Sequence, residues 1–212
     1  MTNYGFIKVA SAIPELRVAD CKFNISKIEE LIRKAEEKHV RIICFPEMSI
    51  TAYSCGDLFF QQKLVGDAES ALKDLIESTA SLPITVIVGI PILHGNQVFN
   101  SAVVFNSGKI LGAVPKINLP NNNEFYEKRW FTTGLNAPTS PIHLAGQTCI
   151  LSPKIIFRYN NVKFGIEICE DLWMPIPPSS HLAINGADII FNPSASNELT
   201  AKNSYRRQLI EQ

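Results

Sequence analysis

The sequence predicts an α/β fold in which helices cover a sheet that contains parallel strands. Two short apolar segments, RIICF at 41–45 and TVIVGI at 85–90, predict buried strands. An amphipathic helical pattern precedes each strand, the first over 25–40 and the second over 66–80. Because strands that alternate with helices form parallel sheets with helical cover, these segments together predict an α/β layer.

The elements before residue 41 follow from the spacing of apolar residues. Residues 5–12 (GFIKVASA) form the first predicted strand. The helix over 25–40 takes Asn24 as its expected N-cap, because asparagine accepts hydrogen bonds from the first backbone N–H groups of a helix. The apolar residues of this helix share one face: Ile25, Ile28, Leu31, Ile32 and Ala35.

The second half of the chain predicts a mixed pattern. The segment 98–116 (VFNSAVVFNSGKILGAVPK) predicts two strands joined by a tight turn at the residues NSG, 106–108. A further strand is expected over 162–168, a short helix over about 179–186, and a strand over 187–193.

Two stretches lack ordinary boundaries. Residues 118–161 contain few periodic runs, and a segment this long without regular elements is typical of a functional region. The last residues, 199–212, begin a helix without a visible stop signal. We therefore expect residues 1–212 to form a single domain whose C-terminal part is missing and whose chain continues in a longer protein.

Composition excludes several classes of protein. The 46% of hydrophobic residues and 19% of charged residues indicate a globular chain. The 20 basic and 20 acidic residues balance, which argues against nucleic acid as a partner. No apolar run is long enough to span a membrane, and the N-terminus does not resemble a signal peptide. Five scattered cysteines without a CxxC pair indicate free thiols in a cytoplasmic protein and no metal site.

Three reactive side chains directly follow predicted strands. Glu47 lies in CFPEMS after the strand over 41–45, Lys116 lies in GAVPKINLP, and Cys169 lies in IEICED. Ligands of open α/β sheets bind outside the carboxyl ends of the strands. The topology therefore brings a carboxylate, an ammonium and a thiol to one edge.

These three groups suit acyl transfer from a carboxamide or nitrile to water. Glu47 would accept the Cys169 proton, because the thiolate is the attacking species. Lys116 and the backbone N–H of Glu170 would stabilise the oxyanion of a tetrahedral intermediate. Lys116 would also offset Glu170 and Asp171, two carboxylates that otherwise oppose thiolate formation beside Cys169.

Other interpretations of these residues stay open. Each of the three could be structural, since a cysteine at a strand end is usually a small core hydrophobe. Cys55 is a rival nucleophile, although no strand precedes it. A Cys–His enzyme would need one of four histidines, none of which follows a clear strand: His39, His94, His143 and His181.

Three segments resemble the carbon–nitrogen hydrolase (nitrilase) superfamily, whose members use Glu, Lys and Cys as a triad. They are FPEMSITAYSCGDLF, VPKINLPNNNEFYEKRWF and FGIEICEDLW, in the family's order. The sequences of these segments are most similar to the N-terminal glutaminase domain of glutamine-dependent NAD synthetases. The resemblance implies a four-layer α-β-β-α sandwich and assigns the triad to Glu47, Lys116 and Cys169.

The resemblance also implies further site residues. Glu127, in EFYEKRWF, would orient the lysine and the substrate, and Tyr53 would close the glutamine pocket. Glu170 would line the substrate site, while Ser196 and Lys202 would bind the amino-acid end of the substrate or cap the final helix.

The function implied is hydrolysis of glutamine to glutamate and ammonia, with the ammonia passed to an ATP-dependent synthetase domain. The glutaminase step needs no cofactor. ATP and Mg²⁺ would serve only the synthetase domain, and no Gly-rich phosphate loop occurs in this chain. A homo-oligomer is expected. The alternatives are a stand-alone amidase or nitrilase that acts on another substrate, and a non-catalytic assembly module.

Overall fold

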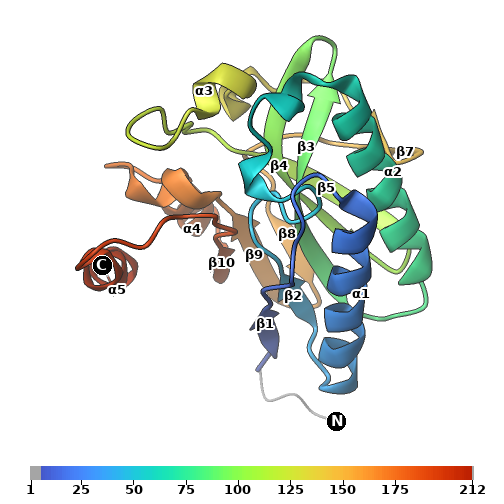
Figure 1. Ribbon diagram of the computed structural model, residues 1–212. Coiled ribbons are helices and arrows are strands. Elements are labelled where there is room, and N and C mark those ends of the chain that lie inside the picture. The colour runs from blue at the N-terminus through green and yellow to red at the C-terminus, as the bar shows by residue number, and fades with distance from the viewer. Residues whose placement is uncertain (1–5, 212) are drawn as a thin grey trace.

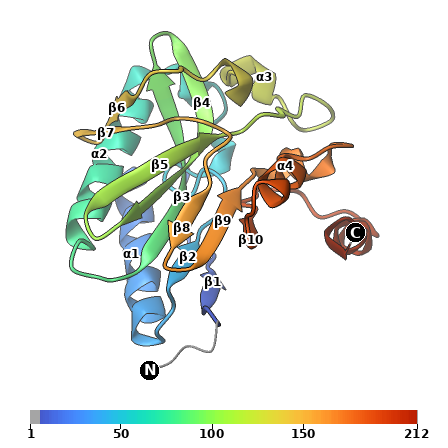
Figure 2. The same cartoon turned by 180° about the vertical axis from the view of Figure 1, so that it is seen from behind.

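A computed structural model describes residues 6–211 and shows four layers (Figure 1). Two helices cover one face of a five-stranded sheet, a three-stranded sheet packs on its other face, and a short helix lies outside the second sheet. This arrangement is the predicted α-β-β-α sandwich. The view from behind shows the second sheet crossing in front of the first (Figure 2).

The larger sheet has the order β1-β2-β3-β4-β5. Strands β1 (Val9–Ser11), β2 (Ile42–Cys44) and β3 (Thr85–His94) are parallel neighbours. Strands β4 (Gln97–Asn106) and β5 (Lys109–Pro115) continue the sheet in antiparallel fashion. The turn at 106–108 is therefore confirmed. Strand β3 extends four residues beyond the predicted end, and β1 is shorter than 5–12, of which Gly5 lies outside the described residues.

Helices α1 (Cys21–Glu37) and α2 (Gln62–Ser78) cover one face of this sheet. The prediction of Asn24 as the N-cap is wrong, because Asp20 accepts the Phe23 N–H and starts the helix earlier. Asn24 is instead buried, where its amide bonds the backbone of Arg17 and Ile50. Helix α2 begins four residues before the expected position, and both helices end slightly before theirs.

The second sheet has the order β10-β9-β8, from β8 (Phe157–Tyr159), β9 (Val162–Ile166) and β10 (Ile189–Phe191). Helix α4 (Pro178–Ile184) connects β9 to its parallel neighbour β10 and packs on the outer face. Gly165 permits this contact, since a Cβ there would lie 2.8 Å from Leu182 Cδ1. Strands β9 and β10 are shorter than predicted, and helix α4 begins and ends slightly earlier than predicted.

Alternation along the strands divides the core into two clusters. Ile43 of β2 faces the helices, whereas Ile42 and Cys44 face the second sheet. Opposite them, β9 contributes Phe164 and Ile166. Because both faces of the large sheet are buried at its centre, β2 and most of β3 are apolar and buried throughout.

The remaining elements are short and surround the rim. They are η1 (Tyr53–Phe60), α3 (Glu127–Trp130), η2 (Gly134–Asn136), β6 (Ile142–Leu144), β7 (Gln147–Cys149) and η3 (Cys169–Trp173). The region 118–161 thus contains only brief elements, as its composition indicates. The final helix α5 (Lys202–Glu211) has no buried residue and stands away from the sandwich in both views (Figures 1 and 2).

Candidate active site

Two close backbone contacts fix the loops that carry Glu47 and Lys116. Strand β3 presents Gly89 beneath the Glu47 loop, where an added Cβ would lie 2.2 Å from Met48 N. Similarly, a Cβ on Gly134 would lie 2.9 Å from the carbonyl oxygen of Lys116. The glycines let both loops pack directly on their neighbours, so the polar side chains are held by backbone contacts.

Lys116 is the centre of the site. Its Nζ donates to Glu47 Oε1 at 2.8 Å and to Glu127 Oε1 at 2.6 Å, and none of the three side chains is exposed. Burial alone would lower the pKa of Lys116. The charges of Glu47 and Glu127 outweigh burial and raise that pKa above its ordinary value, so the lysine is a permanent cation.

Glu127 joins the lysine to the η1 loop. The Tyr53 hydroxyl donates to Glu127 Oε1 at 2.7 Å. Burial and the charge of Glu47 raise the pKa of Glu127 to about 7, although Lys116 and Tyr53 oppose this rise. Burial and the charge of Glu127 raise the pKa of Tyr53, which keeps the phenol protonated as a hydrogen-bond donor.

Both oxygens of Glu47 are hydrogen-bonded. Oε1 accepts from Lys116 Nζ and, at 2.7 Å, from Asn100 Nδ2. Oε2 accepts the Ala195 N–H at 2.9 Å. Because Ala195 follows β10, this contact connects the rims of the two sheets. The carboxylate is held in one orientation from three sides.

Cys169 is the first residue of η3, three positions after the end of β9, and is 6% exposed. Its φ of +47° is unusual for a residue with a side chain and marks a sharp turn at this point. Burial and the charge of Glu47 raise the pKa of Cys169 to about 12, against the opposing effects of Lys116 and the Ala195 N–H. The group is therefore a protonated thiol at neutral pH.

The two carboxylates that follow Cys169 point to different surroundings. Asp171 is buried, and its Oδ1 accepts both the backbone N–H and the side-chain amide of Asn118 at 2.8 Å. Its Oδ2 accepts the Ile168 N–H at 3.0 Å. Asp171 thus joins the loop after Lys116 to the loop that carries Cys169. Its negative charge is stabilised by these N–H donors.

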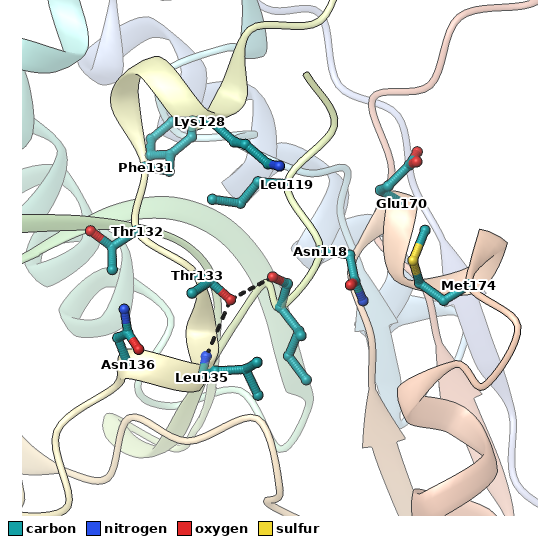
Figure 3. Close-up of a pocket in the computed structure, with 11 residues that line it drawn as sticks. Asn118, Leu119, Lys128, Phe131, Thr132, Thr133, Leu135, Asn136, Glu170 and Met174 are labelled. Carbon is teal, nitrogen blue, oxygen red and sulfur yellow. Dashed lines mark hydrogen bonds between the residues drawn. The ribbon is translucent and has the colours of Figure 1, made fainter. Parts of the chain in front are cut away.

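Glu170 instead lines a cavity of about 660 Å³ beside the buried centre. Figure 3 shows Glu170 and Met174 on one side of this cavity and Lys128 and Phe131 on the other. Its wall includes Ile117, Lys128 and Glu170, which directly follow Lys116, Glu127 and Cys169 in the sequence. Burial raises the pKa of Glu170, while the charges of Lys116 and Lys202 oppose this rise.

Neither Ser196 nor Lys202 is among the residues that line this cavity. Lys202 Nζ donates to Ser196 Oγ at 2.8 Å and to Asn197 Oδ1, and it lies 5.1 Å from the centre of the Trp173 ring. The two predicted residues contact each other, and neither bonds Lys116 or Glu127 among the hydrogen bonds of residues 6–211.

The rival residues lie elsewhere. Cys55 is buried in η1, with its thiol directed at the Thr51 carbonyl oxygen at 3.1 Å, and burial raises its pKa. His181 is on α4 and lines an adjoining cavity of about 850 Å³, which shares Asn118 and Met174 with the cavity that Glu170 lines. Within the described part of the chain, no group of three or more His, Cys, Asp or Glu side chains is arranged to hold a metal ion.

Sequence reasoning missed two contributors. Asn100 in β4 bonds Glu47, and the backbone of Ala195 bonds the same carboxylate from the opposite sheet. A polar residue inside the apolar run VFNSAVVF was the available signal for Asn100. No side-chain pattern could indicate Ala195, because it acts through its N–H.

The chain belongs to the carbon–nitrogen hydrolase family. Residues 8–210 match that family. Glutamine-dependent NAD(+) synthetase from Mycobacterium tuberculosis is 31% identical over 210 residues, which cover 98% of this chain and 31% of the relative. The enzyme of the same name from Thermotoga maritima is 29% identical over 91% of this chain and 31% of its own length. This chain therefore spans about a third of the curated relatives that it matches.

Solved structures share the fold. A glutamine-dependent NAD(+) synthetase from Cytophaga hutchinsonii superposes with a TM-score of 0.83 at 27% identity, over 96% of this chain and 33% of that protein. An amidase from a Nesterenkonia species superposes with a TM-score of 0.70 at 18% identity, over 92% of this chain and 67% of that protein. The sandwich is thus of the nitrilase type. Among residues 6–211, no helix is long and apolar enough to cross a membrane.

Proposed function

We propose that this domain hydrolyses the side-chain amide of glutamine to glutamate and ammonia through a thioester on Cys169. The observation that carries the proposal is the fully buried Lys116, held between Glu47 and Glu127 beside a thiol on which their charges act. A buried cation between two carboxylates is a costly arrangement that favours a functional role. Relatives named glutamine-dependent NAD(+) synthetase support glutamine as the substrate.

Glu47 is the proposed general base. It takes the proton from Cys169 Sγ, and the thiolate attacks the amide carbon of glutamine to form a tetrahedral intermediate. Lys116 Nζ and the backbone N–H of Glu170 stabilise the oxyanion. As the C–N bond breaks, Glu47 returns the proton to the departing nitrogen, which leaves as ammonia.

Water then resolves the glutamyl thioester. Glu47 accepts a proton from the attacking water, the same donors stabilise the second oxyanion, and the C–S bond breaks to release glutamate and restore the thiol. Glu127 and Tyr53 orient Lys116 during both steps through the contacts at 2.6 and 2.7 Å. The raised pKa of Cys169 suits this scheme, because a thiol that stays protonated at rest is activated only when a base is correctly placed.

The cavity of Figure 3 is the proposed entry for the amino-acid end of the substrate. An α-amino acid carries one ammonium and one carboxylate group. In the cavity, Glu170 could bind the ammonium group and Lys128 the carboxylate. Lys202 and Ser196, which lie near Glu170, are the second proposed contact with this end of the substrate.

The ammonia would serve an ATP-dependent synthetase domain that makes NAD in a longer protein, and residues 1–212 would be its glutaminase domain. The support is that the relatives which match over about a third of their length carry the name NAD(+) synthetase. ATP and Mg²⁺ then belong to the synthetase step, and the glutaminase step uses no cofactor. A homo-oligomer in the cytoplasm is part of the same proposal.

The test is ammonia release from glutamine by the 212-residue chain and by two matched cysteine variants. Cys169→Ala should abolish release, whereas Cys55→Ala should retain most of it, since both thiols are buried but the charges of Glu47 and Lys116 act only on the pKa of Cys169. A panel of asparagine, other ω-amides and nitriles decides the substrate. Preference for another amide would replace glutamine hydrolysis with a stand-alone amidase activity, and activity that survives Cys169→Ala would overturn the mechanism.

A further inference from the structure

Asn100, in β4 of the large sheet, contacts Glu47, Glu127 and the backbone of Lys116. Its Nδ2 donates to Glu47 Oε1 at 2.7 Å and lies 3.4 Å from Glu127 Oε2. Its backbone carbonyl accepts the Lys116 N–H at 2.8 Å, one residue beyond the last β4–β5 pair. A single residue therefore bonds both carboxylates through its side chain and the lysine through its backbone.

The orientation of the Asn100 amide is imposed by these carboxylates. If the amide were turned over, its oxygen would face two carboxylate oxygens and both hydrogen bonds would become repulsions. The observed orientation leaves Asn100 Oδ1 without a partner, although the side chain is only 1% exposed. An unsatisfied buried oxygen is unfavourable, so the two donated hydrogen bonds must outweigh its cost.

The need for such a donor follows from the charges. Glu47 and Glu127 face each other across one cation, since both use Oε1 to bind Lys116. The Tyr53 hydroxyl supports Glu127 and the Ala195 N–H supports Glu47, but neither touches both carboxylates. Among the hydrogen bonds of residues 6–211, those of Asn100 and Lys116 alone bridge the pair.

We propose that Asn100 is a positioning residue that keeps Glu47 and Glu127 in register around Lys116, so that Glu47 can accept the proton of Cys169. The neutral amide supplies N–H donors without adding a second cation that would compete with Lys116 for the carboxylates. This inference rests on the proposed proton transfer from Cys169 to Glu47.

Asn100→Asp tests the role with almost no change in size. The new carboxyl group would face Glu47, Glu127 and Lys116 directly, with Tyr53 and Cys169 as the nearest other titratable groups. When protonated it can donate to Glu47 as the amide does. When ionised it repels both carboxylates, adds negative charge near the thiol and withdraws Lys116 from them.

The expected result is a pH-dependent defect. At low pH the variant should approach the wild-type kcat/KM for glutamine, and above the pKa of the new carboxyl group kcat/KM should fall about tenfold per pH unit relative to wild type. Asn100→Ala should lower kcat more than it raises KM at every pH, with a profile parallel to wild type. A purely structural role predicts parallel profiles for both variants and would overturn the inference.

A second readout does not require glutamine. The rate at which iodoacetamide alkylates Cys169, followed by peptide mass mapping, should shift by about one pH unit to higher pH in Asn100→Asp, because an added carboxylate raises the pKa of a neighbouring thiol. If wild type does not hydrolyse glutamine but this shift occurs, the substrate assignment fails and the role of Asn100 stands. An unshifted alkylation profile in a folded variant contradicts the role of Asn100, whatever the substrate.

Asn106→Asp is the matched control. Asn106 ends the same strand, and its amide donates to Thr85 Oγ1 at 3.0 Å, far along β4 from the two carboxylates. This variant should keep the wild-type pH profiles of hydrolysis and alkylation. Cooperative thermal unfolding of each variant confirms that a lost activity does not come from a lost fold. If Asn100→Asp does not fold, the test is the kcat of folded Asn100→Ala, and a kcat equal to that of wild type would overturn the inference.

Discussion

Lys116 Nζ and Glu127 Oε1 lie 2.6 Å apart with neither side chain exposed to solvent, and the same carboxylate oxygen accepts the Tyr53 hydroxyl. This pair places a cation where the strands of the large sheet end. Glu127 lies on the four-residue helix α3. Its Oε1 atom joins Lys116, directly after β5, to Tyr53 of the η1 segment. The proposed oxyanion donor is thereby fixed from both sides.

Glu127 should make stability fall as pH rises. Burial raises the pKa of Glu127 to about 7 from 4.5, so the folded protein binds the proton more tightly than the unfolded chain. The stabilisation is present below pH 4.5 and is lost as pH rises through about 7. Urea unfolding at a series of pH values gives the free energy of unfolding of wild type and of Glu127→Gln. Between about pH 4.5 and 7 this free energy should fall with pH in wild type, and the fall should be absent in the variant. Equal slopes for the two proteins would contradict the assignment.

The same substitution should also reduce catalysis. Glutamine in place of Glu127 removes the charge that holds Lys116 opposite Glu47, and a small displacement of the lysine should lower kcat by about 100-fold. Glu124→Gln is the matched control, because Glu124 lies on the same segment but is exposed. Steady-state ammonia release measures both variants, and a Glu127→Gln enzyme with wild-type kcat would refute the orienting role.

Gly89→Ala should displace the Glu47 loop. The new Cβ would lie 2.2 Å from Met48 N and 2.7 Å from the Pro46 carbonyl oxygen, both backbone atoms. We expect a loss of about 1–3 kcal/mol in the free energy of unfolding, together with a fall in kcat. Gly66→Ala is the control on helix α2, where a Cβ meets nothing within 4 Å. It should leave activity unchanged and stabilise the protein slightly.

Asp171→Ala should loosen the connection between the Lys116 and Cys169 loops. The change leaves the N–H groups of Ile168 and Asn118 without their acceptor, and each buried unsatisfied donor costs about 1–3 kcal/mol. Asp188→Ala removes an exposed bond to the Lys163 N–H near the opposite end of β9. Both variants should melt at lower temperature, but only Asp171→Ala should lose kcat. Equal losses of kcat would indicate a general effect on β9.

The sequence located the strands that precede the three site residues because their signals are local, although the exact strand ends differ by a few residues. Glu47, Lys116 and Cys169 each follow an apolar run directly, and such runs are easily recognised. The N-cap of α1 was misplaced because Asn24 has capping chemistry, yet its partners are the backbone of Arg17 and Ile50, contacts that the fold creates. The start of helix α2 was also misplaced, but for a different reason: no capping side chain marks its first turn.

The remainder of the site depends on contacts between distant segments. Asn100 lies 53 residues from Glu47, and Ala195 lies 148 residues from it. A polar residue within an apolar strand was the only local signal for Asn100, and it does not identify the partner; Ala195 acts through its backbone and leaves no signal in the sequence. Glu127 was placed by family resemblance, and only the fold shows that its carboxylate reaches Lys116.

The most direct test of the central claim is peptide mass mapping after exposure to a diazo-ketone analogue of glutamine. The proposed mechanism predicts one covalent adduct, on Cys169, that excess glutamine prevents. An adduct on Cys55, or labelling of Cys169 that glutamine does not reduce, would contradict the assignment of Cys169 as the nucleophile for glutamine.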